Sequence, residues 1–232
     1  MKIAVLSDIH ANIYALEAVF EDIDRNGCEK ILVLGDLVGY YYWPKKVVNK
    51  IRNDPRCIVI KGNHEELLER CLRDVEFSAK CHKKYGSGFI FCQQQLSEDE
   101  TNWLRLLPSD TEVVINGINI GLYHGSDRST NEYIYPDTNE SRLAKISTKH
   151  DFMFFGHTHY PMTIQHGNCV IINPGSVGQP RDIGSLASYV ILNTQNRAII
   201  NRRISFDIQP LQIKSQTNDP HYPYLHEIFL RK

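Results

Sequence analysis

Long apolar runs are missing from this 232-residue sequence. Nowhere do about 18 apolar residues follow one another, which is the length that a membrane-spanning helix needs. The pattern of a signal peptide, a basic segment followed by an apolar stretch, is also missing before the first predicted strand at Lys2. We therefore expect a cytoplasmic protein that makes no contact with a membrane.

Cysteine motifs and an excess of charge are missing as well. The six cysteines include no Cys-x-x-Cys pair and no zinc-finger spacing, so free thiols in a reducing compartment explain them most simply. The formal net charge is −1, which excludes a basic coat for nucleic acid. Any recognition of phosphate by this chain therefore has to be local.

The sequence shows no internal repeat and no low-complexity segment, and its 42% hydrophobic residues are enough for a sizeable core. We interpret residues 1–208 as a single domain and residues 209–232 as a C-terminal tail for which no element is predicted. Within the domain, helical patterns over residues 65–108 do not alternate with strands, and we expect them to form a cap beside the site.

The first half of the chain alternates strands and helices. Short runs rich in β-branched residues predict the strands, and Asn12 is placed to cap a helix that Gly27 ends. Strands separated by helices in this way are parallel, with right-handed crossovers. The predicted strands are 2–7, 30–34 and 57–60, and the further predicted helices are 43–52, 65–73, 78–95 and 97–108.

The second half predicts hairpins. Asn116-Gly117 between two apolar runs is typical of a type I′ turn, and similar pairs of runs flank residues 166–168 and 193–197. We therefore expect an α/β protein with mixed sheets, parallel early in the chain and antiparallel late.

Side chains that can bind a metal follow five predicted strands: 2–7, 30–34, 57–60, 118–123 and 152–155. In open α/β sheets the ligand lies beyond the carboxyl ends of the strands, so these groups are expected to meet in space. Carboxylate, imidazole and amide groups suit hard divalent ions in hydrolases, whereas a structural zinc site favours thiolates. The candidate ligands are Asp8, His10, Asp36, Asn63, His124, His157 and His159.

The order of the motifs Asp-x-His, Gly-Asp, Gly-Asn-His-Glu, His-Gly and Gly-His-Thr-His resembles the calcineurin-like metallophosphoesterase superfamily, over residues 2–181. Residues 173–182 and the start His124-Gly125-Ser126 look like its small prokaryotic phosphodiesterase-like branch. The resemblance implies a four-layer sandwich, with two packed mixed β-sheets flanked by α-helices.

The resemblance also implies a set of roles. Two divalent metal ions are expected, with Mn²⁺ as first choice and Fe²⁺, Ni²⁺ or Zn²⁺ as alternatives. Asp36 would bridge the ions, and His64 would contact phosphate and protonate the leaving oxygen. The first ion would be held by Asp8, His10 and His159, and the second by Asn63, His124 and His157.

These roles predict a phosphodiesterase in which a metal-activated hydroxide attacks phosphorus in line. A phosphomonoesterase or a protein or nucleotide phosphatase of the same superfamily is an alternative. A catalytically silent metal-binding scaffold is another, although such a scaffold has no need of the proton donor His64. The oligomeric state is left open.

The substrate is expected to be a small phosphate ester, with a nucleotide as one option. The arginine that phosphatase branches place shortly after the second aspartate is missing here, which favours a diester. Tyr41 and Tyr42 either stack on a nucleobase at the rim of the site or pack under the cap. Arg181 either contacts phosphate or braces Asp182 or another carboxylate. Whether Arg128 reaches the site depends on how residues 126–140 fold.

Overall fold

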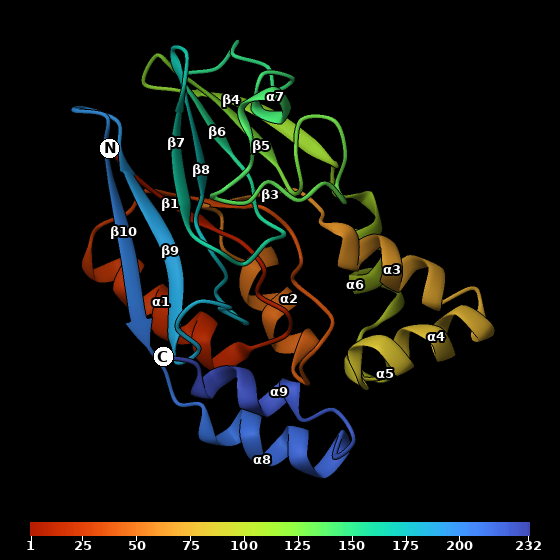
Figure 1. The fold of residues 1–232 in the computed structure, drawn as a ribbon. Helices are drawn as coiled ribbons and strands as arrows, with labels where there is room; N and C mark the ends of the chain where they lie inside the picture. The colour runs from red at the N-terminus through yellow and green to blue at the C-terminus, as the bar shows by residue number, and fades with distance from the viewer.

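The computed structural model describes all 232 residues as ten strands and a set of helices (Figure 1). The strands form two five-stranded sheets, in the orders β10-β9-β1-β2-β3 and β4-β5-β6-β8-β7. The first sheet contains β1 (Lys2–Leu6), β2 (Lys30–Val33), β3 (Cys57–Val59), β9 (Leu186–Asn193) and β10 (Ala198–Ser205). The second contains β4 (Asp110–Ile115), β5 (Ile118–Tyr123), β6 (Phe152–Phe154), β7 (Met162–His166) and β8 (Cys169–Asn173).

Both sheets are mixed. In the first sheet β1, β2 and β3 are parallel, while β9 pairs antiparallel with β1. In the second sheet β5, β6 and β8 are parallel, and the edge strands β4 and β7 are antiparallel to them. The three hairpins predicted in the second half are antiparallel, as expected. The expectation of antiparallel pairing late in the chain is wrong only for β5, β6 and β8, which are parallel to one another. The physical reason is that the segment between β5 and β6 crosses over and returns the chain in the same direction.

Successive side chains along β1 point into two different apolar cores. Ile3 and Val5 face the core between the two sheets, together with residues of β5, β6 and β8. Ala4 and Leu6 face the opposite way, into the core beneath the helices. Both faces of β1 are thus buried, which explains its uninterrupted apolar sequence.

Helices cover the outer face of the first sheet. The helix α1 (Ile13–Arg25) begins at Asn12, whose side chain accepts a hydrogen bond from the N–H of Ala15, and it is followed by Gly27 at φ 65°. Helix α2 (Pro44–Arg52) lies beside α1. No helix of the molecule is both long and apolar enough to cross a membrane.

Four helices gather at one side of the sheets (Figure 1). The predicted helix over residues 78–95 is two helices, because the chain turns at Gly86, which has φ 75°. A capping box of Ser97 and Glu100 opens the last of the four, within the helix predicted over residues 97–108. The four are α3 (Asn63–Cys71), α4 (Val75–Tyr85), α5 (Gly88–Gln95) and α6 (Glu98–Leu106).

The outer face of the second sheet is covered mainly by the segment between β5 and β6. This segment carries one short helix, α7 (Glu140–Leu143), and buries Ile134 and Ile146 against β6 and β8. The hairpin turn between β4 and β5 has positive φ at both Asn116 and Gly117, as a type I′ turn requires. All six cysteines are free.

The segment after residue 208, for which the sequence predicts no element, contains helices. It forms α8 (Gln209–Asn218), α9 (Tyr224–Glu227) and a 3₁₀ turn (Ile228–Leu230). Leu211, Leu225 and Phe229 are buried in a separate apolar core with residues that follow β2. No periodic pattern predicts α8, because its apolar residues Leu211 and Ile213 do not share a face: Leu211 is buried and Ile213 is exposed.

Candidate metal centre

The seven candidate ligands meet beyond the carboxyl ends of the strands. Three overlapping clusters have ligand atoms within 4.8 Å of one another: Asp8, His10 and His159; His10, Asp36 and His64; and Asp36, His124 and His157. Asn63 joins them, since its Oδ1 lies 3.0 Å from Nε2 of His124. All of these side chains belong to buried residues.

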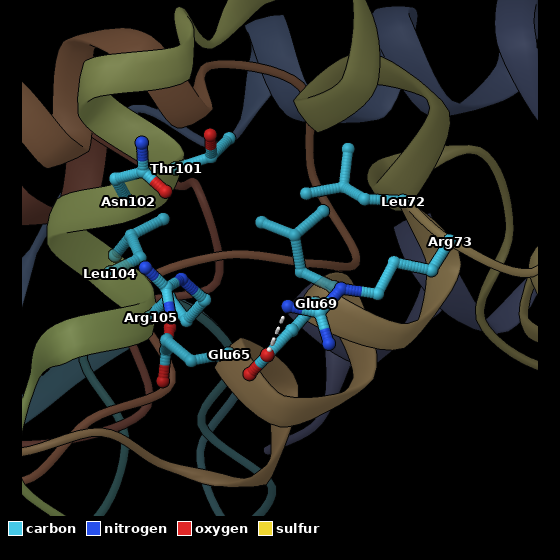
Figure 2. A pocket seen from close by; sticks show the side chains of 9 residues that line it. Glu65, Glu69, Leu72, Arg73, Thr101, Asn102, Leu104 and Arg105 are labelled. Carbon is cyan, nitrogen blue, oxygen red and sulfur yellow. Dashed lines mark ion pairs between the residues drawn. The ribbon is translucent and has the colours of Figure 1, made fainter.

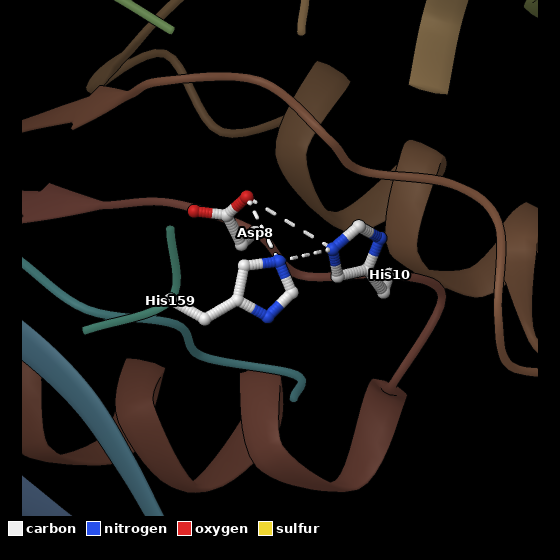
Figure 3. Close-up of side chains that lie close together, drawn as sticks. All are labelled: Asp8, His10 and His159. Atoms are coloured by element: carbon white, nitrogen blue, oxygen red, sulfur yellow. Dashed lines mark hydrogen bonds and ion pairs between the residues drawn. The ribbon is translucent and has the colours of Figure 1, made fainter. Parts of the chain in front are cut away.

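The first group brings one carboxylate and two imidazoles together (Figure 3). Nε2 of His159 lies 3.4 Å from Oδ1 of Asp8, and Nε2 of His10 lies 3.9 Å from the same oxygen. The two Nε2 atoms are 3.1 Å apart, and Oδ1 of Asp8 has no hydrogen-bond donor. Three electron-rich atoms in such proximity repel one another unless a cation lies among them, so this group fits a metal ion.

Asp36 lies between the two ends of the site. Its Oδ2 is 3.3 Å from Nε2 of His124 and 3.8 Å from Nε2 of His10. Its other oxygen, Oδ1, accepts a hydrogen bond from the backbone N–H of His64 at 2.8 Å. A single carboxylate oxygen therefore faces both ligand groups, while the second oxygen holds the carboxylate in place.

Backbone carbonyls orient three of the imidazoles. Nδ1 of His10 donates to the carbonyl of Val38 at 3.1 Å, and Nδ1 of His124 donates to that of Leu34 at 2.7 Å. Nδ1 of His159 donates to the carbonyl of Gln179 at 2.7 Å. Each bond requires a proton on Nδ1, so Nε2 is the atom that each ring can offer to an ion at the centre of the site. Nε2 of His157 is also buried without a partner.

The backbone at the site is strained. Five of the candidate ligands adopt a positive φ, which side chains other than glycine rarely do: Asp8, His10, Asp36, His157 and His159. Residues of this kind cluster at functional sites because the surrounding structure holds them there. Two glycines permit the close packing: a Cβ on Gly62 would lie 2.2 Å from Oδ1 of Asp36, and one on Gly156 would lie 2.0 Å from Oγ of Ser7.

The sequence interpretation gave no role to Glu65, which supports the site from α3. Its carboxylate accepts hydrogen bonds from the backbone N–H groups of Gly62 (2.7 Å), Asp36 (2.9 Å) and Leu37 (2.8 Å). It thereby joins the loop after β2 to the loop after β3. Its position as the last letter of Gly-Asn-His-Glu is the signal that could have identified it.

The carboxylates and imidazoles of the site shift one another's pKa values. Burial opposes ionisation of Asp36, but the neighbouring histidines, His124 first, hold the pKa of its carboxyl well below the usual range. His159 lowers the pKa of Asp8 in the same way against burial. Although burial disfavours its charged form, Asp36 raises the pKa of His124 to about 10. Burial, with His124 nearby, lowers the pKa of His157 to about 4, so this ring is neutral at pH 7.

His64 lies against the centre in a cage of rings. The ring centroid of His10 is 4.6 Å away, and those of Tyr40 and Tyr85 are 4.9 and 5.1 Å away. Its Nδ1 has no partner. Burial lowers the pKa of this histidine to about 4, which keeps the free ring neutral at pH 7.

A small cavity opens onto these groups. Besides Asp36, Asn63, His64, His157 and His159, it is lined by Tyr40, Lys84, Tyr85, Tyr133 and Arg181. Arg181 forms no ion pair, in contrast to most arginines of the chain, and Asp182 is paired with Arg203 instead. The alternative in which Arg181 braces Asp182 is therefore wrong. Arg128 pairs with Glu132 and does not line the cavity.

Tyr41 and Tyr42 lie away from the cavity, and their burial contradicts the rim position. Tyr41 is 0% exposed and Tyr42 is 1% exposed, in the core formed with the C-terminal helices. The hydroxyl of Tyr42 donates to Asp219 at 2.8 Å. The substrate contact expected for these two rings is wrong, because α8 and α9 cover them.

A second cavity lies between α3 and α6 (Figure 2). An ion pair between Arg73 and Glu69, 2.8 Å long, stands on one wall of it. Leu68, Leu72 and Leu104 also line it, and none of the three clusters of metal-competent groups does. The three clusters of metal-competent groups therefore lie outside this cavity.

Comparison with known proteins places this geometry in context. The family model described as the calcineurin-like phosphoesterase superfamily domain matches residues 1–197. An uncharacterised protein of Methanocaldococcus jannaschii is 33% identical over 225 residues, covering 89% of this chain and 88% of the relative. Phosphodiesterase YfcE of Escherichia coli is 24% identical over 209 residues, covering 86% and 91%. The crystal structure of a metallophosphoesterase from Sphaerobacter thermophilus is similar at a TM-score of 0.74, with 30% identity and 94% of each chain covered.

Proposed function

Because the chain belongs to the calcineurin-like phosphoesterase superfamily, and is thus a metal-dependent phosphoric ester hydrolase, we propose that it hydrolyses a small phosphodiester at a centre for two divalent cations. The observation that carries this proposal is the position of Asp36. One of its oxygens lies within 3.8 Å of imidazoles from both ligand groups, where a shared ligand of two ions belongs.

The donor set fits such a pair of ions. Asp8, His10 and His159 would hold one ion, and Asn63, His124 and His157 the other, with Asp36 shared. Mixed oxygen and nitrogen donors suit Mn²⁺, and Fe²⁺, Ni²⁺ or Zn²⁺ are alternatives. When bound, the ions would supply Lewis-acid polarisation of the phosphoryl oxygens and a nucleophilic water at neutral pH.

His64 would give a proton to the leaving oxygen. Its ring lines the cavity beside the shared carboxylate, and its Nδ1 has no partner in the protein. The protonated ring is needed for this role, and the negative phosphate of the substrate would favour that form by raising the pKa of the buried ring. General acid catalysis of this kind contributes roughly 10²- to 10⁴-fold to the rate.

Lys84 and Arg181 would bind the non-bridging oxygens of the phosphate. Both line the cavity, and neither forms an ion pair with a carboxylate of the chain. Arginine offers a planar pair of donors to phosphate, and lysine offers a compact charge. The two cations come from α4 and from the loop after β8, so substrate would be held between two parts of the molecule.

The likeness to a phosphodiesterase and the missing arginine after Asp36 support a diester rather than a monoester. The test is hydrolysis of bis(4-nitrophenyl) phosphate and of 4-nitrophenyl phosphate by the protein loaded with Mn²⁺. We expect faster, metal-dependent release from the diester. Faster release from the monoester would favour a phosphomonoesterase, and no release from either ester while Mn²⁺ binds would favour a silent scaffold.

A further inference from the structure

A row of aromatic rings leads outward from the metal centre. The ring of Tyr133 stacks on that of His157, with centroids 4.0 Å apart and planes inclined by 29°. Tyr135 continues the row, 5.7 Å from Tyr133 and nearly parallel to it at 4°. Tyr160, which follows the ligand His159 in sequence, lies edge-on to Tyr135 at 6.2 Å. The row therefore connects two candidate ligands to the surface.

The outer end of this row opens into a cleft. Tyr135, Pro136, Asp137 and Tyr160 line it, and we call it the tyrosine cleft. None of the metal-binding motifs contributes a side chain to the cleft, so the proposed hydrolysis leaves it without a role. Neither tyrosine hydroxyl at the cleft donates a hydrogen bond within the protein. The cleft offers a ligand the flat, apolar faces of the two rings.

The charges indicate which part of a substrate the cleft suits. Lys84 and Arg181 line the cavity over the metal centre, whereas the cleft contains no cation and one exposed carboxylate, Asp137. Asp137 forms no ion pair, so it would repel a second phosphate and accept hydrogen bonds from N–H or O–H groups. Anionic and aromatic parts of a substrate would thus be sorted to different places.

We propose that the tyrosine cleft binds the nucleobase of a nucleotide phosphodiester whose phosphate lies at the metal centre. The proposal rests on the proposed function and adds the substrate class to it. A nucleobase has a flat face that stacks on tyrosine, and its N–H groups can donate hydrogen bonds to the carboxylate of Asp137. Tyr133, between the cleft and His157, keeps the two subsites adjacent.

The test compares two esters with the same charge and the same leaving group, thymidine 5′-(4-nitrophenyl) phosphate and methyl 4-nitrophenyl phosphate. With Mn²⁺ bound, we expect kcat/KM to be higher for the thymidine ester. This preference for the thymidine ester should fall at least about fivefold in Tyr135→Leu and in Tyr160→Leu. Base stacking contributes about 1–3 kcal/mol, and a loss of about 1 kcal/mol corresponds to about fivefold. Tyr135→Phe and Tyr160→Phe, which keep the ring, should retain it.

Equal kcat/KM values for the two esters in the wild-type protein, or a preference that survives both leucine variants, would overturn the proposal. Calorimetric binding of thymidine 5′-monophosphate and methyl phosphate to the Mn²⁺-loaded protein gives a second measurement. If neither ester is hydrolysed, the proposed function fails, while tighter binding of the nucleotide still supports the cleft. Equal binding of the two phosphates would reject the cleft, even if a leucine variant does not fold.

Discussion

The carboxylate of Glu65 accepts a hydrogen bond from the backbone N–H of Asp36 at 2.9 Å, so a side chain of α3 fixes the residue proposed to be shared by two ions. The same carboxylate also accepts from Gly62 and Leu37. Glu65→Ala would leave these donors buried and unpaired. Each such donor costs about 1–3 kcal/mol, and we expect the free energy of unfolding to fall by at least about 3 kcal/mol.

Metal affinity reports the positioning effect separately from stability. Loss of groups that orient metal ligands typically weakens binding by roughly 10- to 100-fold, and we expect a loss of this size in Glu65→Ala. Calorimetric titration with Mn²⁺ measures it. Glu66→Ala changes the adjacent, exposed carboxylate and should affect neither quantity. Wild-type Mn²⁺ affinity in a folded Glu65→Ala protein would contradict the role of Glu65.

His64 and Asp36 should separate turnover from metal binding. We expect His64→Ala to lose about 10²- to 10⁴-fold in kcat while it keeps both ions, because the ring donates a proton and is not required as a ligand. Asp36→Asn should lose metal as well as turnover, since the amide carries no charge to share between two ions. Metal content by atomic emission, measured beside the kinetics, checks both outcomes. A metal-depleted His64→Ala protein would show that this ring is a ligand.

Removal of metal should destabilise the protein. The centre contains the buried carboxylates of Asp8 and Asp36 among imidazoles whose lone pairs point inward. A bound ion stabilises the folded state by about 2.7 kcal/mol when its free concentration is a hundred times Kd. We expect EDTA to lower Tm and added Mn²⁺ to restore it in the wild type, whereas Asp36→Asn should respond far less. An identical response of both proteins would place the ions elsewhere.

Local sequence signals predict the position of the metal centre well. The apolar runs that end at Asp8, Asp36 and Asn63 are parallel neighbours in the structure, and their carboxyl ends do meet at one edge. This works because strand direction and strand end are local properties, fixed by alternation and turn residues. The cap of α1 at Asn12 and the turn at Asn116 follow from equally local preferences.

Long-range pairing is what the sequence does not disclose. Strand β9 pairs with β1 across more than 180 residues, and β10 pairs with β9. No short pattern indicates which sheet such a late hairpin extends. Tyr41 and Tyr42 show the same limit. Their aromatic character suits a rim and a core equally well, and only the folding of Leu225 and Phe229 over them decides for the core.

Asp219 ties the C-terminal segment to the wall of the cavity. Its buried carboxylate accepts hydrogen bonds from the hydroxyl of Tyr42 at 2.8 Å and from Oγ and the backbone N–H of Ser87 at 2.7 and 2.9 Å. Ser87 lies one residue beyond Gly86, which ends α4, the helix that carries Lys84. We expect Asp219→Ala to cost about 3 kcal/mol of stability and to raise KM, because Lys84 is held less firmly.

Mn²⁺ affinity should not change in Asp219→Ala, since none of its partners is a candidate ligand. Asp207→Ala, at an exposed carboxylate before α8, is the matched control and should leave KM unchanged. An unaltered KM in a folded Asp219→Ala protein would show that α4 is positioned without this contact.

Asp22 should control part of the acid stability. Burial raises the pKa of its carboxyl, but hydrogen bonds from Arg202 at 2.8 and 2.9 Å and from the hydroxyl of Tyr189 at 2.6 Å outweigh burial and lower it overall. A carboxyl whose pKa is lowered by folding stabilises the protein at pH values above its unfolded pKa of about 3.9. This contribution is lost as pH falls through the folded pKa.

Asp22→Asn should therefore cost about 2 kcal/mol at pH 7, and the difference from wild type should shrink below about pH 4. Urea unfolding of both proteins across this pH range measures the difference, in which the contribution of bound metal cancels.

Asp24→Asn is the control. It breaks only an exposed pair with Arg56 and should cost less than about 1 kcal/mol. A constant difference between wild type and Asp22→Asn down to pH 2 would show that packing, and not the charge of Asp22, accounts for the loss.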